Sequence, residues 1–217
     1  GLYRESLVIR REIKHRQGEA DSLNNLGSIA ATRGGLDEAE RLYRESLAIR
    51  REIGDRQGEA DSQHNLGNIA GRRGDLDEAE RLYQESLTIE TKIGNQVGVY
   101  KSLSNLGNIA KIRGDLDEAE RLYQESLAIR REVGTRSGEA DSLNSLGNIA
   151  KIRGDLEGAE RLYRESLVIR REIGDRRGEG VSLNNLGNIA KIRGDLDEEE
   201  RLYRESLDID REIGDRQ

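Results

Sequence analysis

Residues 74–94 have the sequence GDLDEAERLYQESLTIETKIG, and this stretch decides the fold. Related copies follow at residues 114–134, 154–174 and 194–214, and another precedes it at 34–54, so that each lies 40 residues after the last. A fixed period of this size is typical of a stacked repeat structure. The chain of 217 residues is therefore expected to be a single array over residues 1–217. Its repeats span residues about 14–53, 54–93, 94–133, 134–173 and 174–213, and residues 1–13 match the second half of a repeat.

The second half of each repeat has the pattern of an amphipathic helix. In residues 34–54 the mainly apolar positions recur at spacings of three and four, as expected for one buried face of a helix. These positions are Leu36, Ala39, Leu42, Tyr43, Ser46, Leu47, Ile49 and Ile53. Asp75 followed by Glu78 predicts a capping box at the helix start. Gly35 takes the place of this aspartate in the first repeat, and a weaker cap is expected there.

The first half of each repeat predicts another helix, with Leu103, Leu106, Ile109, Ala110 and Ile112 as its apolar set in the third repeat. Gly107 lies inside this helix, where glycine costs about 1 kcal/mol relative to alanine. Such a residue indicates that another helix comes very close, and Gly27, Gly67, Gly147 and Gly187 are equivalent. The expected caps of the first helices are Asp55, Asn95, Thr135 and Asp175. Links of about two residues make the two helices antiparallel neighbours.

Composition limits the classes of partner. The formal net charge is -7, which disfavours nucleic acid and acidic membrane surfaces, because both need a basic face. Hydrophobic residues make up only 34% of the chain, but their strict period argues against disorder. There is no cysteine and no apolar run long enough to span a bilayer. No compartment signal is present, and the cytoplasm is the default expectation. Because Gly1 falls inside a repeat, a fragment or a processed or engineered product is expected.

Two short strings give the sequence a specific resemblance. Leu103-x2-Leu106-Gly107-x2-Ala110 and Ala119-x3-Tyr123 are similar to the tetratricopeptide repeat (TPR) pattern. The repeat departs from that pattern in having no aromatic residue at its start, alanine in place of the first-helix tyrosine, and no proline. It also has 40 residues where the usual TPR has 34, and in this it resembles the long repeats of kinesin light chain and of the spindle-orientation adaptors. The resemblance covers essentially the whole chain.

The resemblance implies an all-α fold, an α-solenoid of antiparallel helix pairs that form a right-handed TPR superhelix. First helices would line a concave groove and second helices the outside. Near-identical units that pack on their neighbours in the same way also predict a superhelix from the residues alone.

The candidate binding site is a ladder of polar residues on the first helices. In the TPR family this face lines the groove, and asparagine offers both a donor and an acceptor to the backbone of an extended peptide. The predicted groove residues are Asn24, Ser28, His64, Asn68, Asn108, Lys111, Asn144, Asn148, Lys151, Asn184, Asn188 and Lys191. The three lysines, together with Arg113, Arg153 and Arg193, would give the groove a basic edge that suits an acidic peptide. Asp21, Asp61 and Asp141 at the other end would make it bipolar.

Simpler interpretations stand beside these. Asn25, Asn65, Asn105 and Asn185 are expected to bridge neighbouring first helices instead of binding a ligand. Val97, Val99 and Tyr100 interrupt the repetition and form a possible secondary contact patch, although local drift packed against the preceding helix is the preferred explanation. His15 and His64 are 49 residues apart and are expected to be ordinary surface residues. No catalytic, metal or cofactor site is indicated.

The sequence thus predicts a non-catalytic scaffold for protein–protein interaction that binds a peptide or protein segment in its groove. The alternatives are a structural module that self-associates through its terminal repeats, where Leu2, Leu7 and Ile9 would be partly uncovered, and a spacer or regulatory part of a larger protein. An enzyme has no support from any residue pattern.

Overall fold

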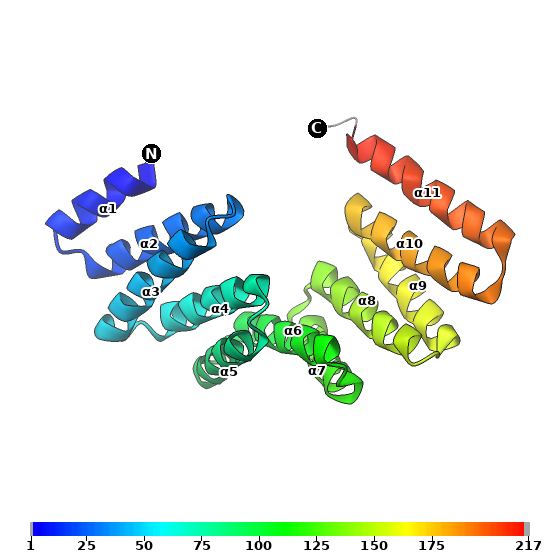
Figure 1. The fold of residues 1–217 in the computed structure, drawn as a ribbon, viewed down its shortest axis with the longest axis horizontal. Helices are drawn as coiled ribbons and strands as arrows, with labels where there is room; N and C mark the ends of the chain where they lie inside the picture. The colour runs from blue at the N-terminus through cyan, green and yellow to red at the C-terminus, as the bar shows by residue number, and fades with distance from the viewer. Residues whose placement is uncertain (1, 215–217) are drawn as a thin grey trace. The chain divides into compact units, whose positions relative to one another are not determined.

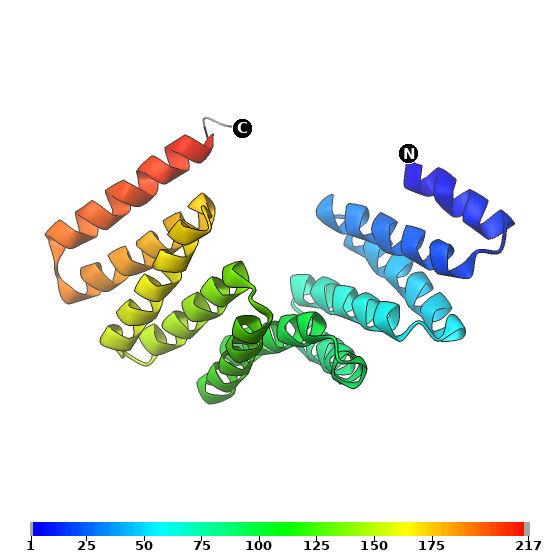
Figure 2. The same cartoon turned by 180° about the vertical axis from the view of Figure 1, so that it is seen from behind.

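The computed structural model describes residues 2–214, and all its regular elements in that range are α-helices (Figures 1 and 2). Their bounds are α1 Leu2–Glu12, α2 Arg16–Thr32, α3 Leu36–Ile53, α4 Arg56–Arg73, α5 Leu76–Ile93, α6 Gln96–Arg113, α7 Leu116–Val133, α8 Arg136–Ile152, α9 Leu156–Glu172, α10 Arg176–Arg193 and α11 Leu196–Gly214. The prediction of an all-α protein is confirmed. We call α2, α4, α6, α8 and α10 the first helices and the remaining ones the second helices.

The chain forms two compact units, Gly1–Ile109 and Ala110–Gln217, with α6 running from one into the other. In the first unit α1 packs on α2, α2 on α3, α3 on α4 and α4 on α5. In the second unit the same succession runs from α7 to α11. Within each unit these packed helices lie side by side in opposite directions (Figure 1). Each unit is therefore an α-solenoid of antiparallel helix pairs, as predicted.

The link between α4 and α5 shows how the chain reverses. Gly74 has a φ of 81°, a left-handed conformation that glycine adopts without strain. Its N–H donates to the carbonyl of Gly71, and the N–H of Asp75 donates to the carbonyl of Ala70, both at 3.0 Å. This pair of bonds is a Schellman motif, which satisfies two carbonyls at the end of the helix. The same left-handed glycine occurs from Gly34 to Gly194, and Lys14, with a φ of 55°, adopts this conformation in the first link.

The predicted caps are partly confirmed. Asp75 accepts a hydrogen bond from the N–H of Glu78, and Gly35 provides no side-chain cap. The capping box is wrong, because the carboxylate of Glu78 binds Arg81 and does not return to the N–H of Asp75. Asp55, Asn95 and Asp175 cap their first helices through the N–H three residues on. Thr135 makes no side-chain cap bond, so that prediction is wrong.

Within a repeat, the two helices are joined by a tyrosine that occupies the space left by a glycine. A Cβ atom added to Gly67 would lie 2.7 Å from Cε1 of Tyr83, whose side chain is buried. The predicted close approach is therefore confirmed, and the group that approaches is an aromatic ring. Three other pairs repeat the arrangement, namely Gly27 with Tyr43, Gly147 with Tyr163 and Gly187 with Tyr203.

Between repeats, a second glycine receives a charged side chain. Arg130 is buried at the end of α7, and its guanidinium donates to the carbonyl of Gly138 at 2.5 Å. A Cβ at Gly138 would lie 2.8 Å from Nη1 of Arg130. Arg50 and Arg170 are buried at equivalent positions. The helix pattern did not predict this burial, because an arginine belongs to the charged face by composition.

One predicted core position is exposed. Ile112, expected in the apolar set, is 64% exposed, and the equivalent Ile152 and Ile192 are 55% and 58% exposed. The other four residues of that set, Leu103, Leu106, Ile109 and Ala110, are buried. The isoleucines lie four residues beyond Asn108, Asn148 and Asn188, so they share a helix face with these asparagines.

Candidate functional site

In each unit, the predicted groove residues lie on the first helices, on the face that we call the first-helix face. In the first unit it carries Asn24, Ser28, His64, Asn68 and Asn108. In the second unit it carries Lys111, Asn144, Asn148, Lys151, Asn184, Asn188 and Lys191. Ser28, Asn108, Asn184 and Lys191 are exposed and the others are half-buried. All twelve can be reached from solvent, and their role in binding stays a prediction.

Two asparagines of the ladder are engaged by the neighbouring first helix. Nδ2 of Asn65 donates to Oδ1 of Asn24 at 3.0 Å, and Nδ2 of Asn185 donates to Oδ1 of Asn144 at 2.7 Å. The predicted bridging by Asn65 and Asn185 is confirmed. The carbonyl oxygens of Asn24 and Asn144 therefore already have a partner, which sequence reasoning did not foresee.

Three other asparagines are fixed by the core tyrosines. The hydroxyls of Tyr83, Tyr163 and Tyr203 donate to Oδ1 of Asn68, Asn148 and Asn188 at 2.7, 2.8 and 2.9 Å. Burial raises the pKa of Tyr83 and Tyr163 to about 12, so both stay protonated donors. Because the tyrosine occupies the oxygen, each amide is oriented with its NH2 group away from the core. Within residues 2–214 these three NH2 groups donate no hydrogen bond, so each is available to a ligand acceptor.

His64 replaces the asparagine of this ladder in the second repeat. Its ring centroid lies 5.4 Å from that of Tyr83, and its Nε2 is 3.3 Å from Nδ2 of Asn105. Burial, aided by the positive charge of Lys101, lowers the pKa of His64 to about 4. The expectation of an ordinary surface residue is wrong, because His64 is a neutral, half-buried ring at pH 7. Asn105 thus bridges to its neighbour, as predicted.

The charges on the first-helix face differ from the prediction. Arg153 pairs with Asp117 and Glu120, and Arg193 pairs with Glu160, so these arginines are drawn to second helices. Asp141 is neutralised by Arg170, and Asp21 lies 3.2 Å from Arg50. The predicted bipolar groove is wrong on these points. In the described chain Lys111, Lys151 and Lys191 form no ion pair and are the unpaired cations of this face in the second unit.

The secondary patch is not built as the sequence suggested. Tyr100 is buried, with 8% of its surface exposed, and cannot serve as an aromatic anchor. Val99 is half-buried, and only Val97, at 39%, is exposed. The burial of Tyr100 agrees with the simpler interpretation, in which this residue packs against the preceding helix.

Clefts that the sequence analysis missed lie on the side of the second helices. One, of about 540 Å³, lies among α3, α4 and α5, with a floor that includes Leu47, Leu66 and Ile69. An equivalent cleft of about 600 Å³ lies among α9, α10 and α11, over Leu167, Leu186 and Ile189. Arginines and glutamates that pair with one another form the walls, as in Arg81 with Glu78 and Glu85. The residues that line one cleft lie 120 residues before those that line the other, and this recurrence is the signal in the sequence.

Residues 2–214 contain no group of three or more histidine, cysteine, aspartate or glutamate side chains that could hold a metal ion. They also contain no helix that is long and apolar enough to cross a membrane.

Comparison with protein families identifies the repeat. A tetratricopeptide repeat model matches residues 2–52, 18–92, 98–172 and 138–212. The chain belongs to the tetratricopeptide repeat family. Repeats of this family typically mediate protein–protein interaction and are generally non-catalytic scaffolds. No curated protein sequence matches the chain.

Solved structures similar to this TPR array share its fold. BtubC (BKLC) from P. vanneervenii is 22% identical with a TM-score of 0.86, over 98% of this chain and 89% of that one. A Podosopora anserina putative kinesin light chain with nearly identical TPR-like repeats is 20% identical with a TM-score of 0.74, over 92% and 98%. A Rap protein complexed with Competence and Sporulation Factor is 13% identical with a TM-score of 0.75, over 89% of this chain and 54% of that one. The predicted likeness to kinesin light chain repeats is confirmed.

Proposed function

We propose that this TPR array is a non-catalytic scaffold that binds an extended segment of another protein along its first-helix face. The observation that carries the proposal is the tyrosine-held orientation of Asn68, Asn148 and Asn188. A fixed amide gives up little side-chain entropy on binding, and its NH2 group suits the carbonyl or carboxylate oxygens of an extended chain.

The second unit favours an acidic segment. Lys151 and Lys191 stand three residues after Asn148 and Asn188, one helical turn along the same face. The exposed Ile152 and Ile192 lie beside them and offer apolar contact. A segment that alternates acidic and apolar side chains would therefore meet amide donors, ammonium groups and methyl groups in turn. The acidic preference is part of the proposal and applies to the second unit alone.

The test uses isosteric changes. Asn148→Asp with Asn188→Asp keeps an oxygen for each tyrosine hydroxyl but replaces the NH2 donor with a negative charge. The probes are twelve-residue peptides selected from a random displayed library on the unmodified protein and then synthesised with a fluorescent label. We expect the double variant to weaken binding at least tenfold in anisotropy titrations, because both donors are lost and like charges oppose each other.

A matched control makes the same amide-to-carboxylate change away from this face. Gln84→Glu with Gln124→Glu alters exposed residues of the second helices α5 and α7 and adds the same charge. The control should bind as the unmodified protein does. Equal affinity for all three proteins would refute the proposed site. An equal loss of binding in both variants would show that net charge, and not the position of the amides, controls binding.

Self-association through the ends is a second candidate. Tyr3, Val8 and Ile9 of α1, and Ile13 directly after it, are 47–66% exposed, and Leu196 and Leu207 of α11 are 71% and 48% exposed. Large exposed apolar groups of this kind favour association. Light scattering over a hundredfold dilution would show a concentration-dependent mass if the ends associate, and a constant monomer mass would exclude it.

A further inference from the structure

Four of the five contacts between a second helix and the following first helix, which we call joints, share one ion network. At the joint of α3 and α4, Nε of Arg51 donates to Glu59 at 2.9 Å, and Arg56 donates to the other carboxylate oxygen at 2.5 Å. The Glu59 side chain is only 8% exposed. The joints of α1 with α2, α7 with α8, and α9 with α10 repeat the network around Glu19, Glu139 and Glu179.

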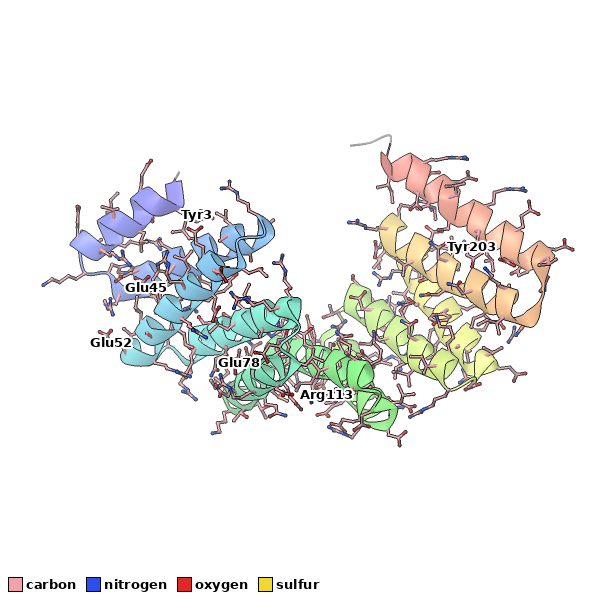
Figure 3. The ribbon with its side chains drawn as sticks, viewed as in Figure 1. Tyr3, Glu45, Glu52, Glu78, Arg113 and Tyr203 are labelled. Carbon is pink, nitrogen blue, oxygen red and sulfur yellow. The ribbon has the colours of Figure 1, made fainter. Side chains whose placement is uncertain are left out.

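The network extends to the next second helix. Arg11 and Arg16 also bind Glu45 and Glu52 of α3, which are labelled in Figure 3. Arg131 and Arg136 bind Glu165 and Glu172 of α9 in the same way. Each carboxylate accepts hydrogen bonds from two charged guanidinium groups, and charge-assisted hydrogen bonds are shorter and roughly twice as strong as neutral ones.

The joint of α5 and α6 lacks the residues of this ion network. Thr91, Gln96 and Val99 occupy the positions of the two arginines and the glutamate. The hydroxyl of Thr91 donates within its own helix, to the carbonyl of Leu87. The two helices still touch, since the hydroxyls of Ser86 and Ser102 lie 3.5 Å apart, as Ser46 and Ser62 do at the joint of α3 and α4. The ion network of the other four joints is absent here.

The buried charge at this joint is also reversed. Glu90 stands where Arg50 and Arg130 stand elsewhere, is 1% exposed, and has an oxygen, Oε2, without a hydrogen-bond partner. Its carboxylate lies over Gly98, with Oε1 and Oε2 both 2.3 Å from where a Cβ would be. Lys101 replaces the aspartate found at 61 and 141, so the sign of this pair is inverted with respect to Arg130 and Asp141.

We propose that the joint of α5 and α6 is a built-in opening point of the array, weaker than the other joints at neutral pH and tightened by acid. In a repeat stack, stability is a sum of repeat and joint contributions, so the joint with the fewest interactions opens first. The absent ion network acts in this direction, because the other four joints have charge-assisted hydrogen bonds that this one lacks. The inference does not depend on the proposed binding function.

The acid response follows from the groups around Glu90. Burial, with the negative charge of Asp61, raises the pKa of Glu90, while Asn95, Lys101 and Gln57 oppose the rise. The closed joint therefore binds a proton more readily than the open one, and its stability is lost as pH rises through the pKa of Glu90. The pKa of Asp61 is also raised by burial, and the negative charge of Asp55 adds to this rise. The side chains of Arg50, Gln57 and Lys101 oppose it.

At the joint of α7 and α8, stability depends on pH in the opposite direction. Burial alone would raise the pKa of Glu139, but hydrogen bonds from Arg131 and Arg136 lower it overall. This joint is therefore most stable above the ordinary glutamate pKa and weakens as pH falls. The two joints should respond to acid in opposite directions within one molecule.

Hydrogen–deuterium exchange of the intact protein tests the proposal, with protection normalised to the intrinsic rate at each pH. At pH 7 the amides of residues 91–101 should be at least tenfold less protected than those of residues 51–61 and 131–141, which are equivalent positions. As pH falls from 7 toward the ordinary glutamate pKa, their protection should rise while that of residues 131–141 does not. Equal protection at the three joints, or a fall at residues 91–101 on acidification, would overturn the proposal.

Two variants separate the causes. Thr91→Arg, Gln96→Arg and Val99→Glu together restore the ion network and should raise protection of residues 91–101 about tenfold at pH 7. Glu90→Gln keeps the shape without the charge, and it should raise neutral protection and abolish the acid response. The matched control, Arg131→Thr, Arg136→Gln and Glu139→Val, should loosen residues 131–141. If none of the three variants changes protection at its own joint, the ion network and Glu90 do not set joint strength.

Discussion

In the second, fourth and fifth repeats, one tyrosine connects the core to the exposed polar face. The ring of Tyr83 lies against Gly67, and its hydroxyl holds Asn68. A substitution that moved the ring would therefore disturb both the packing of the helix pair and the orientation of the amide. This dependence explains why the glycine is useful inside a helix, where it is otherwise unfavourable.

We expect Gly67→Ala to destabilise the protein although alanine is the better helix former. The added Cβ would lie 2.7 Å from Cε1 of Tyr83, which is buried and cannot withdraw. Overpacking of this kind costs about 1–3 kcal/mol and outweighs the propensity gain of about 1 kcal/mol. Urea unfolding followed by circular dichroism measures the difference.

Gly71→Ala in the same helix is the matched control for that change. Its Cβ would find Oη of Tyr83 at 3.9 Å and Cβ of Ala79 at 4.0 Å, which are ordinary contacts. It should stabilise the protein by about 0.5–1 kcal/mol. If Gly67→Ala also stabilised the protein, the tight contact with Tyr83 would not exist in solution.

Individual residues set the limit of what the sequence could predict. The glycine predicted a close approach, but not that a tyrosine ring would make it. Arg50 and Glu90 share a helix position and are both buried, although composition places such residues outside. Their burial depends on the glycine eight residues later, a contact across the link between repeats that the spacing within one helix does not reveal.

Each helix as an element was well predicted, because period and cap residues are local signals. The failures concern side chains with two possible partners. Glu78 could return to the N–H of Asp75 or bind Arg81, and the structure has the second. Asn68 could face a ligand with either end of its amide, and only the hydroxyl of Tyr83 decides which.

The start of α3 offers a test at this scale. Gly35 occupies the N-cap position with a φ of −77°, a conformation open to any residue, and makes no side-chain bond. In Gly35→Asp the new carboxylate should accept the N–H of Glu38, as Asp75 accepts that of Glu78. We expect a gain of about 0.5 kcal/mol from the bond and the helix dipole. Thermal unfolding measures the gain in stability. The reverse change, Asp75→Gly, should destabilise the protein by a similar amount. If Gly35→Asp also destabilised the protein, the carboxylate would not cap the helix.

For the whole molecule, most perturbed carboxylates favour neutral pH. The pKa of Glu78, Glu118 and Glu198 is lowered, in each case first by a hydrogen bond from the arginine three residues on. Folded pKa values below the unfolded ones give stability that is present above about pH 4.5 and is lost as pH falls. Glu90 and Asp61 act in the opposite sense, and both lie near one joint, because Glu90 belongs to the joint of α5 and α6 and the charge of Asp61 acts on it from α4.

His64 adds an earlier step to acid unfolding. Its folded pKa of about 4 lies below the ordinary value of 6.5, so the unfolded state binds the proton more readily. Stability from this group is present above pH 6.5 and declines as pH falls toward 4. We expect urea unfolding to show a loss of about 1 kcal/mol between pH 7.5 and pH 5, after allowance for the partial exposure of the ring. His64→Asn, which installs the residue found at 24, 144 and 184, should remove this step and leave the steeper loss below pH 4.5. A protein that gained stability over the whole range from pH 7.5 to pH 3.5 would show that the arginine-bound carboxylates do not control its acid response.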